Sequence, residues 1–167
     1  RPAYCPSDPH GEAIAAAFAE YTGDAQDARL ARMAAKVEGL CYQPVPGSDA
    51  VNARWTRVED LVALARLMGW TRIGIATCIG LLDECQQLSD ILRAQGLEPF
   101  SACCKAGSIE KLALGLEEGD KVRPGTFEPA CNPIAQARIL NAEGMEMNII
   151  MGLCVGHDSL FFKHAQG

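Results

Sequence analysis

The chain has 167 residues, of which 49% are hydrophobic and 22% charged, a balance close to that of ordinary globular domains. Its net charge is −6 and it has no basic stretch, which disfavours nucleic acid as a partner because phosphate binding needs clustered Lys and Arg. No apolar run reaches the length of a membrane span, and the first residues do not resemble a signal peptide. We therefore expect a cytoplasmic protein without membrane contact, processed or trimmed before Arg1.

Eight cysteines are many for a chain of this size. A secreted disulfide framework would be small and loop-rich, whereas this sequence has Ala- and Leu-rich helix patterns, so reduced thiols are the favoured interpretation. Reduced cysteines either pack as small hydrophobic residues or bind metal and react. We expect packing for Cys85, which falls within a helix pattern, and leave Cys41 open between the two roles.

Residues 1–55 predict an N-terminal helical extension that contains Cys5 in its irregular, Pro-rich start. Two helix patterns follow, and Gly39 supplies the stop signal of the second. A loop containing Pro44, Pro46 and Gly47 ends the extension. The irregular start, the two helices and the loop cover residues 1–10, 12–21, 25–38 and 42–53.

Residues 56–167 predict an α/β core. Thr56 and Glu59 form a capping-box pattern at the start of its first helix. Helix and strand patterns then alternate: strands over 72–77, 98–103 and 147–153, and helices over 56–68, 81–94, 132–144 and from 158. Such alternation implies a Rossmann-like open, mainly parallel sheet with flanking helices. The polar, Gly- and Pro-rich segment 105–130 is long for a loop, and such loops are usually functional or mobile.

Cysteines follow each of the three predicted strands. Cys78 comes after the first strand, Cys103 and Cys104 close the second, and Cys154 follows the third. Ligands of open parallel sheets bind outside the carboxyl ends of the strands, so we expect these thiols to converge. Converging thiols suit a soft metal, a cluster or a thiol active site.

Two further residues join this group. Cys131 directly precedes the helix start Asn132-Pro133, where free N–H groups and the helix dipole stabilise a thiolate. His157 follows Cys154 by three residues, a spacing at which both side chains can share one ion, and Asp158 is expected to cap the last helix. No C-x-x-C, bacterial ferredoxin run, G-x-G-x-x-G, P-loop or G-x-S-x-G motif is present.

Four stretches together resemble one family, the cysteine-rich prokaryotic metal-binding proteins of domain of unknown function 1847. The stretches are Gly74-Ile75-Ala76-Thr77-Cys78-Ile79-Gly80-Leu81, Cys103-Cys104-Lys105-Ala106-Gly107, Arg123-Pro124-Gly125 with Cys131-Asn132-Pro133-Ile134-Ala135-Gln136-Ala137, and Gly152-Leu153-Cys154-Val155-Gly156-His157-Asp158-Ser159-Leu160-Phe161. The resemblance runs from about Thr56 to Lys163, and the opening Pro2-Ala3-Tyr4-Cys5-Pro6 is similar as well. It implies a metal-binding protein without a settled activity. The family pattern also has cysteines before the position of Cys5 and a strand after that of Gly167.

The main hypothesis is a cysteine-ligated metal protein with a redox, electron-transfer or sensing role. Its candidate ligands are Cys5, Cys78, Cys103, Cys104, Cys131, Cys154 and His157. An iron–sulfur cluster, of the 4Fe–4S type by preference, is favoured over zinc because the thiols are scattered over several turns and exceed what tetrahedral zinc needs. A redox partner protein and self-association are both compatible with this role. The alternatives are a structural zinc protein, or a metal-free thiol enzyme with Cys78 or Cys154 as nucleophile and His157 as base.

Overall fold

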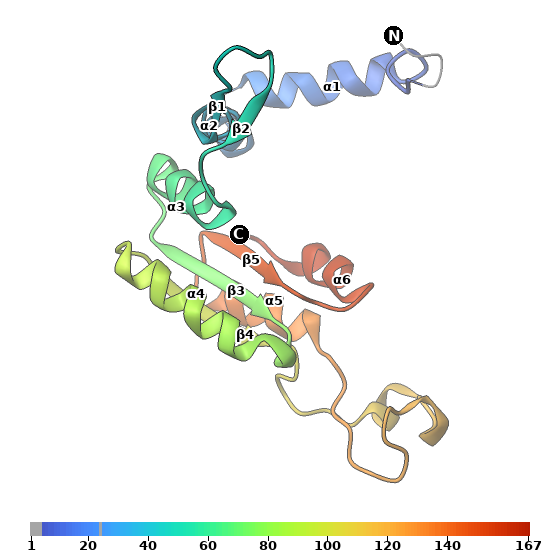
Figure 1. Cartoon of the computed structure of the whole chain (residues 1–167). Helices are drawn as coiled ribbons and strands as arrows, with labels where there is room; N and C mark the ends of the chain where they lie inside the picture. The colour runs from blue at the N-terminus through green and yellow to red at the C-terminus, as the bar shows by residue number, and fades with distance from the viewer. Residues whose placement is uncertain (1–4, 24) are drawn as a thin grey trace. The chain divides into compact units, whose positions relative to one another are not determined.

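The structure is a computed structural model that describes residues 5–23 and 25–167, and it divides into two compact units, Arg1–Gly69 and Trp70–Gly167. The described elements of the first unit are α1 (Gly11–Thr22), α2 (Gln26–Cys41), β1 (Tyr42–Pro44), β2 (Val51–Ala53) and α3 (Arg57–Met68) (Figure 1). The predicted capping box of α3 is confirmed. Thr56 Oγ1 accepts the Glu59 N–H at 3.4 Å, and Glu59 Oε2 accepts the Thr56 N–H at 2.6 Å.

Two features of the first unit differ from the sequence prediction. Helix α2 continues through Gly39 to Cys41, because a glycine within a helix costs only about 1 kcal/mol and does not by itself end it. The segment predicted as a loop over 42–53 instead contains an antiparallel hairpin in which β1 pairs with β2. Its turn is closed by the bond from Val45 N to Ala50 O at 2.9 Å.

The second unit is a mixed α/β structure built on a small parallel sheet, as predicted. Its strands are β3 (Arg72–Thr77), β4 (Glu98–Cys103) and β5 (Met147–Met151), in the order β4-β3-β5. The connecting helices are α4 (Leu82–Ala94) and α5 (Pro133–Ala142), which lie on opposite faces of the sheet, and α6 (His157–His164), which packs against α5 (Figure 1). Strand β5 ends two residues earlier than predicted because Gly152 turns the chain with a φ of +64°.

The core between the sheet and α5 is built from small and large apolar side chains. Its buried members are Ala76, Ala102, Ala137, Leu140, Met145 and Phe161. Gly74 in the central strand is required here, because a Cβ atom at this position would lie 2.1 Å from Asn148 Oδ1. Side chains from β5 and from α5 and the segment after it therefore lie close to the backbone of β3, and β3 pairs in parallel register with β4 up to Thr77 and Cys103.

Residues 105–130 form an excursion between β4 and α5, which we call the 105–130 lobe. It contains two short 3-10 helices, η2 (Lys111–Leu114) and η3 (Glu118–Asp120), and its two arms are joined by a bridge between Glu110 and Pro129. The lobe is therefore an organised segment, although it was expected to be a loop. In the described part of the chain, no helix has both the length and the hydrophobicity that crossing a bilayer requires.

Candidate functional site

Three thiols gather where strands β3 and β4 end. Thr77 at the end of β3 pairs with Cys103 at the end of β4, and the Cys104 N–H then donates to Thr77 O at 2.9 Å. Cys78 follows β3 directly, and its N–H donates to Met151 O at the end of β5 at 3.0 Å. The register of the parallel sheet thus places Cys78, Cys103 and Cys104 at one edge, as the sequence analysis expected.

Cys104 is the buried member of this group, with 3% of its surface exposed. Its Sγ accepts a hydrogen bond from the Ile79 N–H at 3.3 Å. Burial raises the pKa of Cys104 to about 12, and the neighbouring sulfurs of Cys131 and Cys103 act in the same direction, against the Ile79 bond. The thiolate form of Cys104 is therefore disfavoured, and its side chain interacts with that of Cys131, a residue 27 positions further along the chain.

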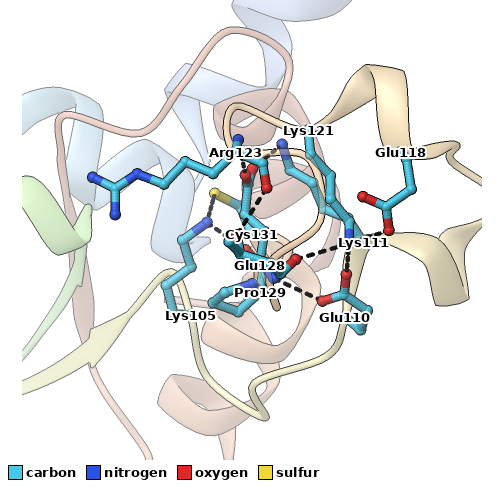
Figure 2. Close-up of polar contacts among 10 residues, drawn as sticks. Lys105, Glu110, Lys111, Glu118, Lys121, Arg123, Glu128, Pro129 and Cys131 are labelled. Carbon is cyan, nitrogen blue, oxygen red and sulfur yellow. Dashed lines mark hydrogen bonds and ion pairs between the residues drawn. The ribbon is translucent and has the colours of Figure 1, made fainter.

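Cys131 reaches the strand ends because α5 begins beside Cys104. The Asn132 N–H donates to Cys104 O at 2.7 Å, and Asn132 Oδ1 caps α5 by accepting the Ala135 N–H at 3.0 Å. Lys105, the next residue after Cys104, donates from Nζ to Cys131 Sγ at 3.3 Å and to Pro129 O at 2.7 Å (Figure 2). An ammonium group thus faces the half-buried Cys131 sulfur.

Gln136, which is fully buried on α5, ties these elements together. Its Nε2 donates to Thr77 O at 3.1 Å and to Ala102 O at 2.7 Å. These carbonyls precede Cys78 and Cys103, so one side chain clamps the carboxyl ends of β3 and β4 to α5. Its Oε1 accepts no hydrogen bond from any residue in 5–23 or 25–167.

The 105–130 lobe next to Cys131 is held together by ion pairs around a buried lysine. Lys121, with a side chain only 3% exposed, pairs with Glu110 and Glu118, and Lys111 pairs with Glu128 (Figure 2). Hydrogen bonds to Glu110 and Glu118 raise the pKa of Lys121. Contacts with the two lysines and with backbone N–H groups hold the pKa of all three carboxylates below its usual value.

Among the described residues of the second unit, the side chains of Cys154 and His157 make no hydrogen bond to this cluster. Cys154 is exposed in the turn after β5, and its contact with His157 is a backbone one, from His157 N to Cys154 O at 2.9 Å. Cys5 lies in the first unit, where a hydrogen bond with Ser7 at 3.2 Å lowers its pKa. Cys85 and Cys41 are buried packing residues.

One expectation needs correction, and two residues of the site were missed. Asp158 does not cap α6, because α6 begins one residue earlier, at His157, with Gly156 as its N-cap. Asp158 Oδ1 instead accepts the N–H of Ser159 at 2.7 Å. The sequence analysis gave no role to Lys105 or Gln136. The one signal for either residue was its place in a stretch that resembles the family, residues 103–107 for Lys105 and 131–137 for Gln136.

The donor chemistry of the cluster suits a soft metal, because all its members are thiols. Among the described residues, no group of three or more His, Cys, Asp and Glu side chains is arranged to hold a metal ion. Side chains would therefore have to rotate for a third or fourth sulfur to join the Cys104–Cys131 pair. Cys78 and Cys103 are the nearest candidates along the chain, because Cys78 adjoins Ile79, whose N–H donates to Cys104 Sγ, and Cys103 adjoins Cys104 itself.

Comparison with known proteins agrees with the resemblance seen in the sequence. The model of the family described as protein of unknown function (DUF1847) matches residues 5–167. The chain belongs to this family. A relative described as an uncharacterized protein, from Methanocaldococcus jannaschii, is 38% identical over 141 residues, which cover 84% of this chain and 66% of that protein. The chain thus spans slightly less than two thirds of the relative, and no solved structure matches it significantly.

Proposed function

We propose that the protein binds a soft metal through cysteine sulfurs at the carboxyl ends of β3 and β4, with an iron–sulfur cluster as the favoured occupant. The observation that supports this most directly is the contact between Cys104 and Cys131, two thiols far apart in sequence. Donors already point at these sulfurs, from Ile79 N–H and Lys105 Nζ. Such hydrogen bonds offset the negative charge that thiolate ligands carry when they bind metal.

The topology of the sheet supports the same location. From β3 the chain crosses by α4 to β4 on one side, and then by α5 to β5 on the other side of β3. We interpret this as a Rossmann-like, doubly wound arrangement, in which ligands bind at the carboxyl ends of the strands where the winding changes direction. Cys78 follows β3 at this point.

Four residues would hold the metal: Cys78, Cys103, Cys104 and Cys131. When bound, an iron–sulfur cluster would supply one-electron transfer or redox sensing. The chain itself contributes the positive charge of Lys105 beside Cys131 and the clamp made by Gln136. The cytoplasm, where thiols stay reduced, and a redox partner protein suit this role.

The test is metal analysis and absorbance spectroscopy on the full chain purified without oxygen. We expect iron and sulfide with a broad visible band that is lost on oxidation. Cys104→Ser and Cys131→Ser should each lower metal affinity by at least about tenfold. Cys85→Ser is the matched control, because Cys85 is equally buried but lies within α4, and it should retain the metal.

The outcomes separate the alternatives. Stoichiometric zinc without visible absorbance would replace the cluster with a structural zinc site while keeping the ligands. Retention of metal in Cys104→Ser and Cys131→Ser, with loss in Cys85→Ser, would contradict the site. Absence of any metal, together with one fast-alkylating cysteine, would favour a thiol enzyme.

A further inference from the structure

Cys104 and Cys131 are neighbours in space although 27 positions separate them in the sequence. Disulfides join residues whose Cα atoms lie about 4.4–6.8 Å apart. The bond from Asn132 N to Cys104 O, at 2.7 Å, brings the two backbone segments to the spacing of hydrogen-bonded neighbours, and the Cys104 and Cys131 side chains face each other. This backbone bond and the interaction between the two side chains hold Cys104 and Cys131 as neighbours.

The two sulfurs differ in access and in surroundings. Cys131 is partly exposed, and the ammonium group of Lys105 donates to its sulfur at 3.3 Å. Cys104 is buried, with 3% of its surface exposed. A small oxidant therefore reaches Cys131 first, and Lys105 stabilises the negative charge that develops on the attacking sulfur. Cys104, whose side chain interacts with that of Cys131, is the thiol that we expect to complete the reaction.

We propose that Cys104 and Cys131 form a reversible disulfide when the protein meets a peroxide. Cys131 sulfur attacks one peroxide oxygen, the O–O bond breaks, and Cys131 becomes a sulfenic acid while the other oxygen leaves as water. Cys104 sulfur then attacks Cys131 sulfur, the S–O bond breaks, and a second water leaves. In total, two thiols are oxidised by two electrons and one hydrogen peroxide is reduced to two waters.

The disulfide would close the 105–130 lobe into a covalent ring, since the lobe begins right after Cys104 and ends right before Cys131. It would also remove two sulfurs from the proposed metal ligands, so oxidation would release the metal. This second consequence rests on the proposed function, whereas the disulfide itself does not.

The experiment uses the full chain, reduced, freed of metal by a chelator and then treated with one equivalent of hydrogen peroxide. Two of the eight thiols should become unreactive toward a thiol reagent and recover with dithiothreitol. Trypsin cuts after Lys105, Lys121 and Arg138, but not between Arg123 and Pro124, so the bond should link peptide 94–105 to peptide 122–138. Mass spectrometry without reduction detects this linked pair.

Variants identify the sulfurs, because peptide 94–105 contains both Cys103 and Cys104. The linked pair should persist in Cys103→Ser and vanish in Cys104→Ser and Cys131→Ser. Lys105→Met should slow its formation about tenfold, the value of one hydrogen bond to a charged group, whereas Lys163→Met on α6 should not.

The proposal is wrong if the link requires Cys103, or if Cys131 is oxidised to sulfinic acid without forming a link. Binding of metal by reduced protein that never forms the link would overturn only this inference. Formation of the link by protein that never binds metal would leave it standing and overturn the metal proposal instead.

Discussion

Gln136 offers the sharpest test of how the thiol site is assembled, because its side chain is fully buried and bonds two strand ends. Two substitutions of similar size separate its roles. Gln136→Met removes both N–H donors and keeps the volume. Gln136→Glu also removes them, but it introduces an acid that becomes charged as the pH rises.

The magnitudes follow from the contacts. Each lost hydrogen bond costs about 1 kcal/mol, so Gln136→Met loses about 2 kcal/mol, less whatever is regained by removing the unpartnered Oε1. A protonated Glu can still donate once, so Gln136→Glu loses about 1 kcal/mol at low pH. Burial raises the pKa of a carboxyl by up to about 3–5 units, and each unit is about 1.4 kcal/mol. Because the folded pKa of the introduced Glu is raised, titration adds no further loss of stability below about pH 4. As the pH rises, the variant loses about 3–4 kcal/mol more between pH 5 and pH 8.

The assay is urea unfolding of wild type and both variants at pH 5 and pH 8 with a reductant present. Comparison with wild type at each pH cancels the titration of other groups. We expect the Gln136→Glu deficit to grow with pH and the Gln136→Met deficit to stay constant. If the two variants show the same pH dependence, Gln136 is hydrated and does not clamp the strand ends.

Three further predictions follow from the structure. Gly74→Ala should lower the free energy of unfolding by about 1–3 kcal/mol, because the added methyl group clashes with Asn148. Adding Asn148→Ala to this variant should recover part of the loss. Additive effects of the two substitutions in a double-mutant cycle would contradict the clash. Thr56→Ala should lower the free energy of unfolding by about 1 kcal/mol, because it removes the capping box of α3. Thr22→Ala is the control and should lower thermal stability less, because the Thr22 hydroxyl donates to Ala19 O within the end of its own helix. The pKa of Glu110, Glu118 and Glu128 is below its ordinary value of 4.5, so the ion pairs of the 105–130 lobe stabilise the lobe above that pH and are lost as the pH falls through the lowered values. Amide hydrogen exchange in the lobe should then become faster at acid pH. Exchange that stays unchanged at acid pH would be inconsistent with this account.

The sequence predicted those features of the fold and site that local patterns determine. The ends of β3 and β4, the Asn132 cap and the parallel sheet follow from hydrophobic periodicity and capping residues. The sheet register then places the backbone positions of Cys78, Cys103 and Cys104 at one edge. The roles of Lys105 and Gln136 were missed because their contacts cross 26 to 59 positions. A single sequence carries no periodic signal for such contacts, which depend on how α5 packs on the sheet.

The 105–130 lobe was missed for a different reason: its interior is polar. Sequence patterns detect buried segments by their hydrophobicity, whereas this segment buries Lys121 among carboxylates and leaves Val122 83% exposed. Its ion pairs also bear on the thiol site, because the lobe connects Cys104 to Cys131 directly. Ordering a segment of this length costs conformational entropy, which the Lys121 network offsets. Loss of that network would therefore free Cys131 from its place beside Cys104, so a substitution far from any thiol, such as Lys121→Met, should weaken both metal binding and disulfide formation.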